Sequence, residues 1–205
     1  MFKHGLAALC LSSVLSARFA SVLRLSLATV CLAALLLAVL AAFSASAALA
    51  PPDVTVLAKQ AKTLVRSKRG FRKARLLEAD GTPARPNHKV KTAARIVNWR
   101  FVFDNAASRS KYASAFLKAH NGKFGKVKGN VDPYLEDQVI KKVPRMTLMR
   151  AVKRLVAAGY RNGFYDVTLR KPLFPGVTVS SYIFTVGSGK YVGVNTKTGK
   201  VRPIS

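Results

Sequence analysis

Apolar residues recur at helical spacing in two stretches of the chain, residues 54–65 and 147–158. In the second stretch Thr147 is a suitable N-cap and Gly159 a suitable stop, which predicts a short amphipathic helix. The apolar positions are Val54, Leu57, Ala61, Leu64 and Val65 in the first stretch, and Leu148, Ala151, Val152, Leu155 and Val156 in the second. Each stretch is therefore expected to form a helix with one apolar face.

Strand-like alternation follows the second helix. The pattern predicts one strand around residues 167–169 and another at 182–186, where Tyr and Phe share a face. A tight reversal at Gly187–Gly189 leads into a third strand at 190–194. A further turn is expected at Thr198–Lys200. The predicted unit is a helix followed by three strands.

The first half of the chain repeats this order with longer connections. Gly70-Phe71 corresponds to Gly163-Phe164 and is expected to open a strand that runs through Leu77. A polar loop should follow at 78–92, with Asp80-Gly81 as a turn pair. The alternating aromatics Trp99, Phe101 and Phe103 are expected to pack in the core rather than to stack on bases, and a returning strand is expected to begin at Lys111-Tyr112. The fold class is thus α+β, with two helix-plus-antiparallel-sheet units at 53–130 and 141–205.

The segments TLMRAVKRLVAAGY and YIFTVGSGKYVGVNTKTGKV resemble the PepSY-like family, whose last hairpin typically ends in D-x-x-T-G-K-V. Here Asn195 stands in place of the usual Asp. The resemblance is clear in 141–205 and degenerate in 53–130. It implies a cystatin-like fold in which a helix packs on a curved antiparallel sheet, commonly outside the cytoplasm. It also implies binding or inhibition of other proteins, sometimes as peptidase regulators, and no catalytic residue can be transferred.

The first 52 residues differ from the rest, because they hold three basic residues and no acidic one. The uncharged run 25–50 exceeds the roughly 20 residues that span a bilayer. It ends near Ala45-Ser46-Ala47, an A-x-A cleavage site. Residues 1–47 are therefore predicted to be a signal peptide or bipartite targeting presequence, with a membrane anchor at 25–47 as the alternative. The expected location is outside the cytoplasm, either secreted, in an organelle lumen such as that of a plastid, or membrane-anchored.

Basic residues dominate the remaining chain. The whole sequence has 35 Lys and Arg against 8 Asp and Glu, a net charge of +27, and the stretch 54–77 contains eight of the basic residues and no acid. Such a charge points to an anionic partner. Residues expected to bind an anion or a partner are Lys59, Lys62, Arg66, Lys68, Arg69, Arg72, Lys73, Arg150, Lys153 and Arg154.

Candidate chemistry is sparse. His88 and His120 are solitary, whereas a zinc site needs three or four converging ligands. The turn 187–190 lacks the other residues of a phosphate-binding P-loop. Glu136 and Asp137 are adjacent carboxylates, which on an extended chain face opposite ways and are expected to be solvated. No catalytic residue, metal or cofactor is therefore predicted.

These patterns predict a non-enzymatic, extracytoplasmic, basic binding protein that docks an acidic protein or an anionic surface, for example as a PepSY-like regulator or inhibitor. The alternative is a nucleic-acid or anionic-membrane binder that acts through the basic helix 54–75.

Overall fold

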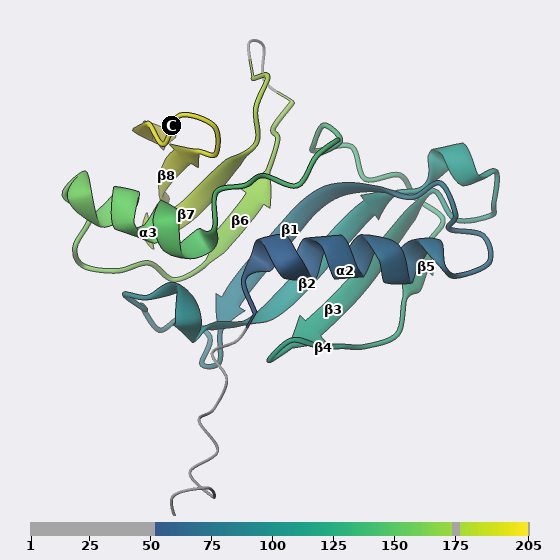
Figure 1. Cartoon of the computed structure of the whole chain (residues 1–205), viewed down its shortest axis with the longest axis horizontal. Coiled ribbons are helices and arrows are strands. Elements are labelled where there is room, and N and C mark those ends of the chain that lie inside the picture. The colour runs from purple at the N-terminus through teal and green to yellow at the C-terminus, as the bar shows by residue number, and fades with distance from the viewer. Residues whose placement is uncertain (1–51, 174–176, 205) are drawn as a thin grey trace, which may run out of the picture. The chain divides into compact units, whose positions relative to one another are not determined.

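The computed structural model describes residues 52–173 and 177–204. These residues form an α+β fold with one nine-stranded antiparallel sheet and two α-helices (Figure 1). The expected α+β class is confirmed at this level. The presequence expected at 1–47 and the alternative anchor at 25–47 lie outside the described residues. Among the described helices, none combines the length and the apolar character that a membrane crossing requires.

Helices and strands follow the chain in an order in which each helix precedes a run of strands. They are α2 (Val54–Arg66), β1 (Arg75–Pro83), β2 (Ile96–Asp104), β3 (Ser114–His120), β4 (Lys123–Phe124), β5 (Lys128–Asn130), α3 (Leu148–Ala157), β6 (Val167–Arg170), β7 (Ser181–Gly187), β8 (Lys190–Asn195) and β9 (Val201–Ile204), with short 3₁₀ turns at Ala93–Arg95 and Ala106–Ser108.

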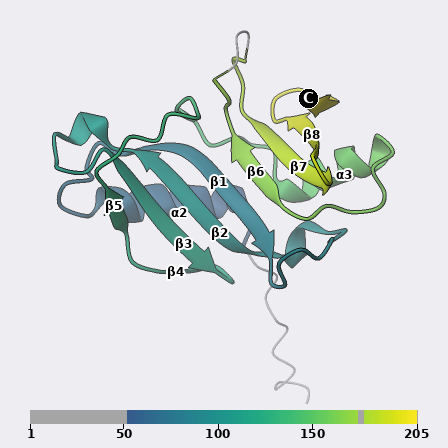
Figure 2. The ribbon, with the colours of Figure 1, turned by 180° about the vertical axis from the view of Figure 1, so that it is seen from behind.

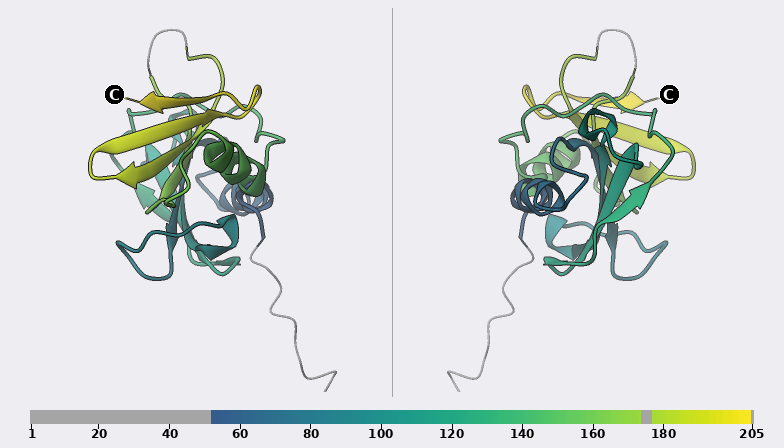
Figure 3. Two further views of the ribbon diagram at one scale, coloured as in Figure 1. Left: turned by 90° about the vertical axis from the view of Figure 1, so that its left-hand side faces the viewer. Right: turned by 90° about the vertical axis from the view of Figure 1, so that its right-hand side faces the viewer.

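The sheet has the order β4-β3-β2-β1-β6-β7-β8-β9, and β5 also pairs with β3. Its centre is the antiparallel pair β1–β6, in which Glu78 lies opposite Arg170. Both helices lie on one face, in front of the strands in Figure 1 and behind them in Figure 2. The views along the sheet in Figure 3 show its twist from one end to the other. The opposite face, here called the open face, is covered by neither helix.

Helix α3 forms as the pattern predicts. The Thr147 hydroxyl accepts a hydrogen bond from the Arg150 amide, and Gly159 adopts a positive φ of 98° just after the helix. The Tyr160 amide then bonds the Leu155 carbonyl, which closes a Schellman motif. The predicted cap and stop of this helix are confirmed.

Asp53 joins the first turns of the two helices. Its Oδ1 accepts from the Thr55 amide at the start of α2, and its Oδ2 accepts from the Leu148 amide at the start of α3, each at 2.9 Å. A carboxylate at a helix N-terminus also interacts favourably with the helix dipole. One side chain therefore holds the N-termini of both helices together.

A single core lies between the helices and the sheet. The predicted aromatic positions of β2 and β7 supply its centre: Phe101, Phe103, Tyr182 and Phe184 are fully buried, and Trp99 is 4% exposed. Their expected role in the core is confirmed. The helices cover them with small and branched residues of their apolar faces. The sequence pattern included Leu64 and Val156 in those faces, but both lie at the solvent edge and are 39% and 38% exposed.

Two strands of the first half, β1 and β3, depart from the predicted boundaries. β1 starts at Arg75 and runs through Asp80-Gly81 to Pro83, so the turn expected there is wrong. The reason is packing, because a Cβ at Gly81 would lie 2.6 Å from both Ile96 and the Trp99 ring. Glycine at this position leaves room for the Trp99 indole and does not reverse the chain. β3 begins at Ser114 rather than at Lys111, because residues 105–113 form a tight loop.

Candidate functional site: the open face of the sheet

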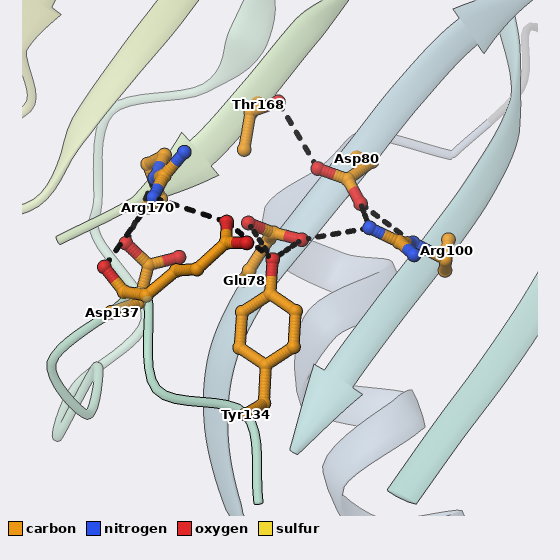
Figure 4. A network of polar contacts seen from close by, with 8 residues as sticks. Glu78, Asp80, Arg100, Tyr134, Asp137, Thr168 and Arg170 are labelled. Atoms are coloured by element: carbon orange, nitrogen blue, oxygen red, sulfur yellow. Dashed lines mark hydrogen bonds and ion pairs between the residues drawn. The ribbon is translucent and has the colours of Figure 1, made fainter. Parts of the chain in front are cut away.

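The open face is built from the strand residues that alternate with the core positions. Because side chains on a strand point to opposite faces in turn, Glu78, Asp80, Arg100, Thr168 and Arg170 project away from the helices. The β1–β6 pairing gathers them at the centre of the sheet, although they come from three strands far apart in the sequence (Figure 4).

Acidic side chains concentrate at this centre. Arg100 Nη2 lies 3.1 Å from Glu78 Oε1 and 2.7 Å from Asp80 Oδ2, and Arg170 Nε donates to Asp137 Oδ1 at 2.8 Å. The Tyr134 hydroxyl donates to Glu78 Oε1 at 2.9 Å (Figure 4). We call this set the carboxylate cluster; its members are Glu78, Asp80, Glu136, Asp137, Arg100, Arg170 and Tyr134.

Burial makes Glu78 an unusual acid. Glu78 is 2% exposed. Burial, followed by the neighbouring carboxyl groups of Asp80 and Asp137, raises its pKa to about 8. Burial also raises the pKa of Asp137, although Arg170 opposes the shift. Within the described residues, Asp137 Oδ2 is buried and has no hydrogen-bond partner. A proton retained by Glu78 at neutral pH reduces the repulsion among the carboxyl groups of this cluster.

The two adjacent acids that the sequence suggested were both solvated differ in their exposure. The Glu136 side chain is 67% exposed, as expected, but Asp137 is 6% exposed and bound to Arg170. The expectation for Asp137 is therefore wrong. It fails because segment 131–140 crosses the end of the sheet, where the Gln138 amide bonds the Lys171 carbonyl and the Ile140 amide bonds that of Leu76.

The two carboxyl groups of the cluster whose pKa values are raised are buried. Glu78 lies beneath Tyr134 of the crossing segment, and Asp137 is itself part of that segment. A general acid or base must reach the proton that it transfers. The geometry therefore suits a structural role, in which these contacts hold segment 131–140 on the sheet.

A groove of about 950 Å³ lies on the open face over β6–β9. Its apolar lining includes Val179, Ile183 and Ile204, and its charged lining includes Arg202. Tyr191 is also in the lining and is 45% exposed. We call this feature the C-terminal groove. Exposed tyrosine and arginine next to apolar side chains are typical of protein-binding surfaces.

A second hollow of about 720 Å³ lies over β1–β4. Arg100, Lys118, His120 and Lys123 contribute to its lining, against Asp80 as its acid. His120 Nδ1 lies 2.6 Å from Asn98 Oδ1, and its Nε2 lies 2.9 Å from Asn121 Nδ2. The described residues contain no group of three His, Cys, Asp or Glu side chains that could hold a metal ion.

The ten predicted binding residues do not form one site. Nine are exposed and Lys62 is half-buried. Because the helix N-termini meet at Asp53, the helices run apart, and Arg150, Lys153 and Arg154 lie away from the basic end of α2 (Figure 1). The apolar face of α2 is buried in the core. This helix therefore presents its cations to solvent and has no free apolar face.

The structure adds cations that the sequence did not single out. Arg109 and Lys111 follow β2 in a loop that contacts the loop after α2, where the Ser108 hydroxyl accepts from the Lys73 amide. Nothing in the local pattern marks Arg109, because its loop meets the other cationic loop through a contact between residues 35 apart in the chain, Lys73 and Ser108. The groove residues of β7–β9 were likewise missed, since alternation predicts which residues face outward but not whether that face is covered.

Comparison of the chain with protein-family models, with curated proteins and with solved structures finds no match.

Proposed function

We propose that this chain is a non-enzymatic binding protein that holds a segment of an acidic partner protein on the open face of its sheet. The observation that carries the proposal is the C-terminal groove, an apolar surface with exposed Tyr191 and with Arg202 on a sheet face that neither described helix covers. An exposed apolar groove on a folded domain is commonly an interaction site.

The excess of basic residues indicates which kind of partner the protein would bind. Three of the 35 Lys and Arg residues lie in residues 1–52, and among the remaining 32, Arg75, Arg100 and Arg170 are those that form ion pairs within the described residues. The other 29 form no ion pair among the described residues, and most of them are exposed to an approaching acidic surface. Complementary charge raises association rates and selects partners.

The finer fold supports the same proposal. A helix followed by a run of antiparallel strands occurs twice, with five strands after α2 and four after α3. Gly70 and Gly163 stand at equivalent places with φ of 85° and 80°, each before a buried Phe. We infer two PepSY-like units, 53–130 and 141–205, paired through β1 and β6. The resemblance implies a regulator or inhibitor of another protein. A location outside the cytoplasm is part of this proposal and rests on the pattern of residues 1–47.

The burial of the most perturbed acid of the carboxylate cluster supports a role without catalysis. This acid, Glu78, lies beneath Tyr134, and the exposed acid Glu136 lies beside Arg170. These contacts hold the crossing segment on the sheet next to the C-terminal groove, whose lining Arg170 shares.

The test is binding of a fluorescein-labelled, 12-residue peptide of alternating Glu and Val, read by anisotropy. We expect the protein to bind it and Tyr191→Ser to weaken binding roughly tenfold, the usual effect of truncating an interface aromatic. Met149→Ser is the matched control, because Met149 is 60% exposed on the outer side of α3.

Amide NMR shifts then locate the peptide, which should perturb β7 and β8. Three results would overturn the proposal. The protein could bind a Lys–Val peptide with the same affinity, the two variants could lose the same peptide affinity, or the amide shifts could be confined to the helix side of the protein.

A further inference from the structure

Two cationic loops meet at the end of the sheet where β1 and β3 begin. Residues 67–74 join α2 to β1, and residues 105–113 join β2 to β3. Strand register brings them together, because Arg75 pairs with Asp104 and Asp104 pairs with Ser114. Neither loop belongs to the C-terminal groove.

Buried contacts lock the two loops to each other. Asn105 is fully buried, and its Nδ2 donates to the Gly70 carbonyl at 3.0 Å and to the Tyr112 carbonyl at 2.8 Å. The Phe71 and Tyr112 rings stack with centroids 5.5 Å apart. The backbone that carries the charges is therefore fixed before any partner arrives, which lowers the entropy lost on binding.

The surface of these loops is uniformly positive. Neither loop contains an acidic residue. Two acids adjoin them: Asp104, which is engaged by Arg75, and the exposed Asp132, whose carbonyl accepts from the Ser114 hydroxyl next to the second loop. Six of their cations are exposed and form no ion pair among the described residues. We call them the cationic platform: Lys68, Arg69, Arg72, Lys73, Arg109 and Lys111.

The make-up of the platform selects among anionic partners. A protein interface has an apolar or aromatic centre, and an interfacial helix inserts apolar side chains into the lipid. Single strands stack their bases on exposed aromatics. The two loops expose no large apolar side chain, since Phe71 is 7% exposed and Tyr112 is stacked against it. Rigid cations without an apolar centre suit a regular row of phosphates.

We propose that the cationic platform binds the phosphate backbone of double-stranded nucleic acid without reading its sequence. Arginine and lysine contact phosphate oxygens directly, and arginine does so with two parallel hydrogen bonds. This binding uses residues different from those of the proposed protein-binding groove, and either activity can be present without the other.

The test is anisotropy of a labelled 20-base-pair DNA duplex with the full chain between 50 and 200 mM salt. About six phosphate contacts give a slope of log affinity against log salt of about −5. The triple variant Arg69→Gln, Arg72→Gln, Arg109→Gln should reduce that slope by about 3 and weaken binding at least roughly 100-fold at 0.1 M salt.

The matched control is Arg150→Gln, Lys153→Gln, Arg154→Gln, which removes the same charge from α3. It should change the slope by less than about 1. Circular dichroism checks that each variant is folded, and Lys68→Gln with Lys111→Gln is a milder platform variant if the triple variant unfolds. Tyr191→Ser should leave duplex binding unchanged, which separates this proposal from the previous one.

Four outcomes would overturn the proposal: no duplex binding, equal losses in the platform and α3 variants, a strong preference between two duplex sequences, or displacement of the duplex by polyglutamate or by anionic phosphatidylserine vesicles at equal charge. The last would assign the platform to an acidic protein or to a membrane surface. Duplex binding that is insensitive to sequence and lost in the platform variant alone supports it.

Discussion

Replacing Glu78 with Gln should make the protein more stable at pH 8 while leaving it nearly unchanged at pH 5. Gln keeps the shape of a protonated Glu. Its carbonyl can accept from Tyr134 and Arg100, and its amide can donate to the buried Asp137 oxygen that has no partner among the described residues. The variant therefore resembles the protonated wild type and cannot acquire the buried charge.

The magnitude follows from the shift in pKa. The pKa of Glu78 rises from 4.5 to about 8 on folding, so above pH 4.5 the unfolded chain loses a proton that the folded chain keeps. Stability due to this proton is complete below pH 4.5 and is lost as the pH rises through 8. The full difference corresponds to roughly 5 kcal/mol, of which roughly 3–4 kcal/mol falls between pH 5 and pH 8.

The assay is urea unfolding of wild type and Glu78→Gln at pH 5, 6.5 and 8. Subtracting one free energy of unfolding from the other removes the titration of all groups that do not interact with Glu78. Glu136→Gln is the control, because the Glu136 side chain is 67% exposed and its substitution should give a difference that is independent of pH. A ¹³C titration of the Glu78 carboxyl should also show a midpoint near pH 8.

Two results would refute this reasoning. A Glu78 carboxyl that titrates near its ordinary pKa of 4.5 would mean that it is solvated in the protein. A difference between wild type and variant that is constant from pH 5 to 8 would mean that the proton is not coupled to folding.

Three further substitutions test the packing. Asp53→Ala should lower the free energy of unfolding by about 2 kcal/mol, more than Thr147→Ala, because it removes the cap of α2 and the bond to α3; equal losses in urea would contradict the bridging role. Gly81→Ala should cost about 1–3 kcal/mol and shift the emission of Trp99, the single tryptophan, because the new Cβ meets its ring; an unchanged spectrum would contradict this contact. Tyr182→Phe should lower the free energy of unfolding by about 1 kcal/mol and thereby lower the thermal midpoint, since the Tyr182 hydroxyl donates to the Met146 carbonyl. An unchanged midpoint would show that this hydrogen bond is dispensable.

Features that depend on neighbouring residues could be predicted from the sequence. Helix α3 has its cap, apolar face and stop within residues 147–159, and the β7–β8 hairpin has its reversal at Gly187–Gly189. In both cases the decisive interactions span a few residues. The same reasoning found the aromatic core positions, because alternation along a strand is local.

Features that depend on distant pairing could not be predicted. In the sequence Gly81 resembles a turn residue, but in the structure it leaves room for the Trp99 ring. The sequence likewise suggests that Asp137 is solvated, but segment 131–140 crosses the sheet and buries it. The platform has the same origin, since strand register, rather than proximity in sequence, brings the loop that carries Arg109 to the loop that carries Lys73. The open face is the strongest case, because its exposure depends on where both helices pack.

The acids and the cations of this protein have different tasks. Asp53, Glu78, Asp80, Asp104, Asp137 and Asp166 all make internal hydrogen bonds or ion pairs, whereas most cations point to solvent. Removing one of these acids therefore breaks a structural contact and also increases the net positive charge, which opposes folding through self-repulsion. Removing Arg69, Arg72 or Arg109 relieves that repulsion and breaks no ion pair among the described residues. Substitutions in the cationic platform can thus weaken binding without lowering stability, so a loss of duplex affinity in a variant at least as stable as wild type reports on the surface and not on the fold.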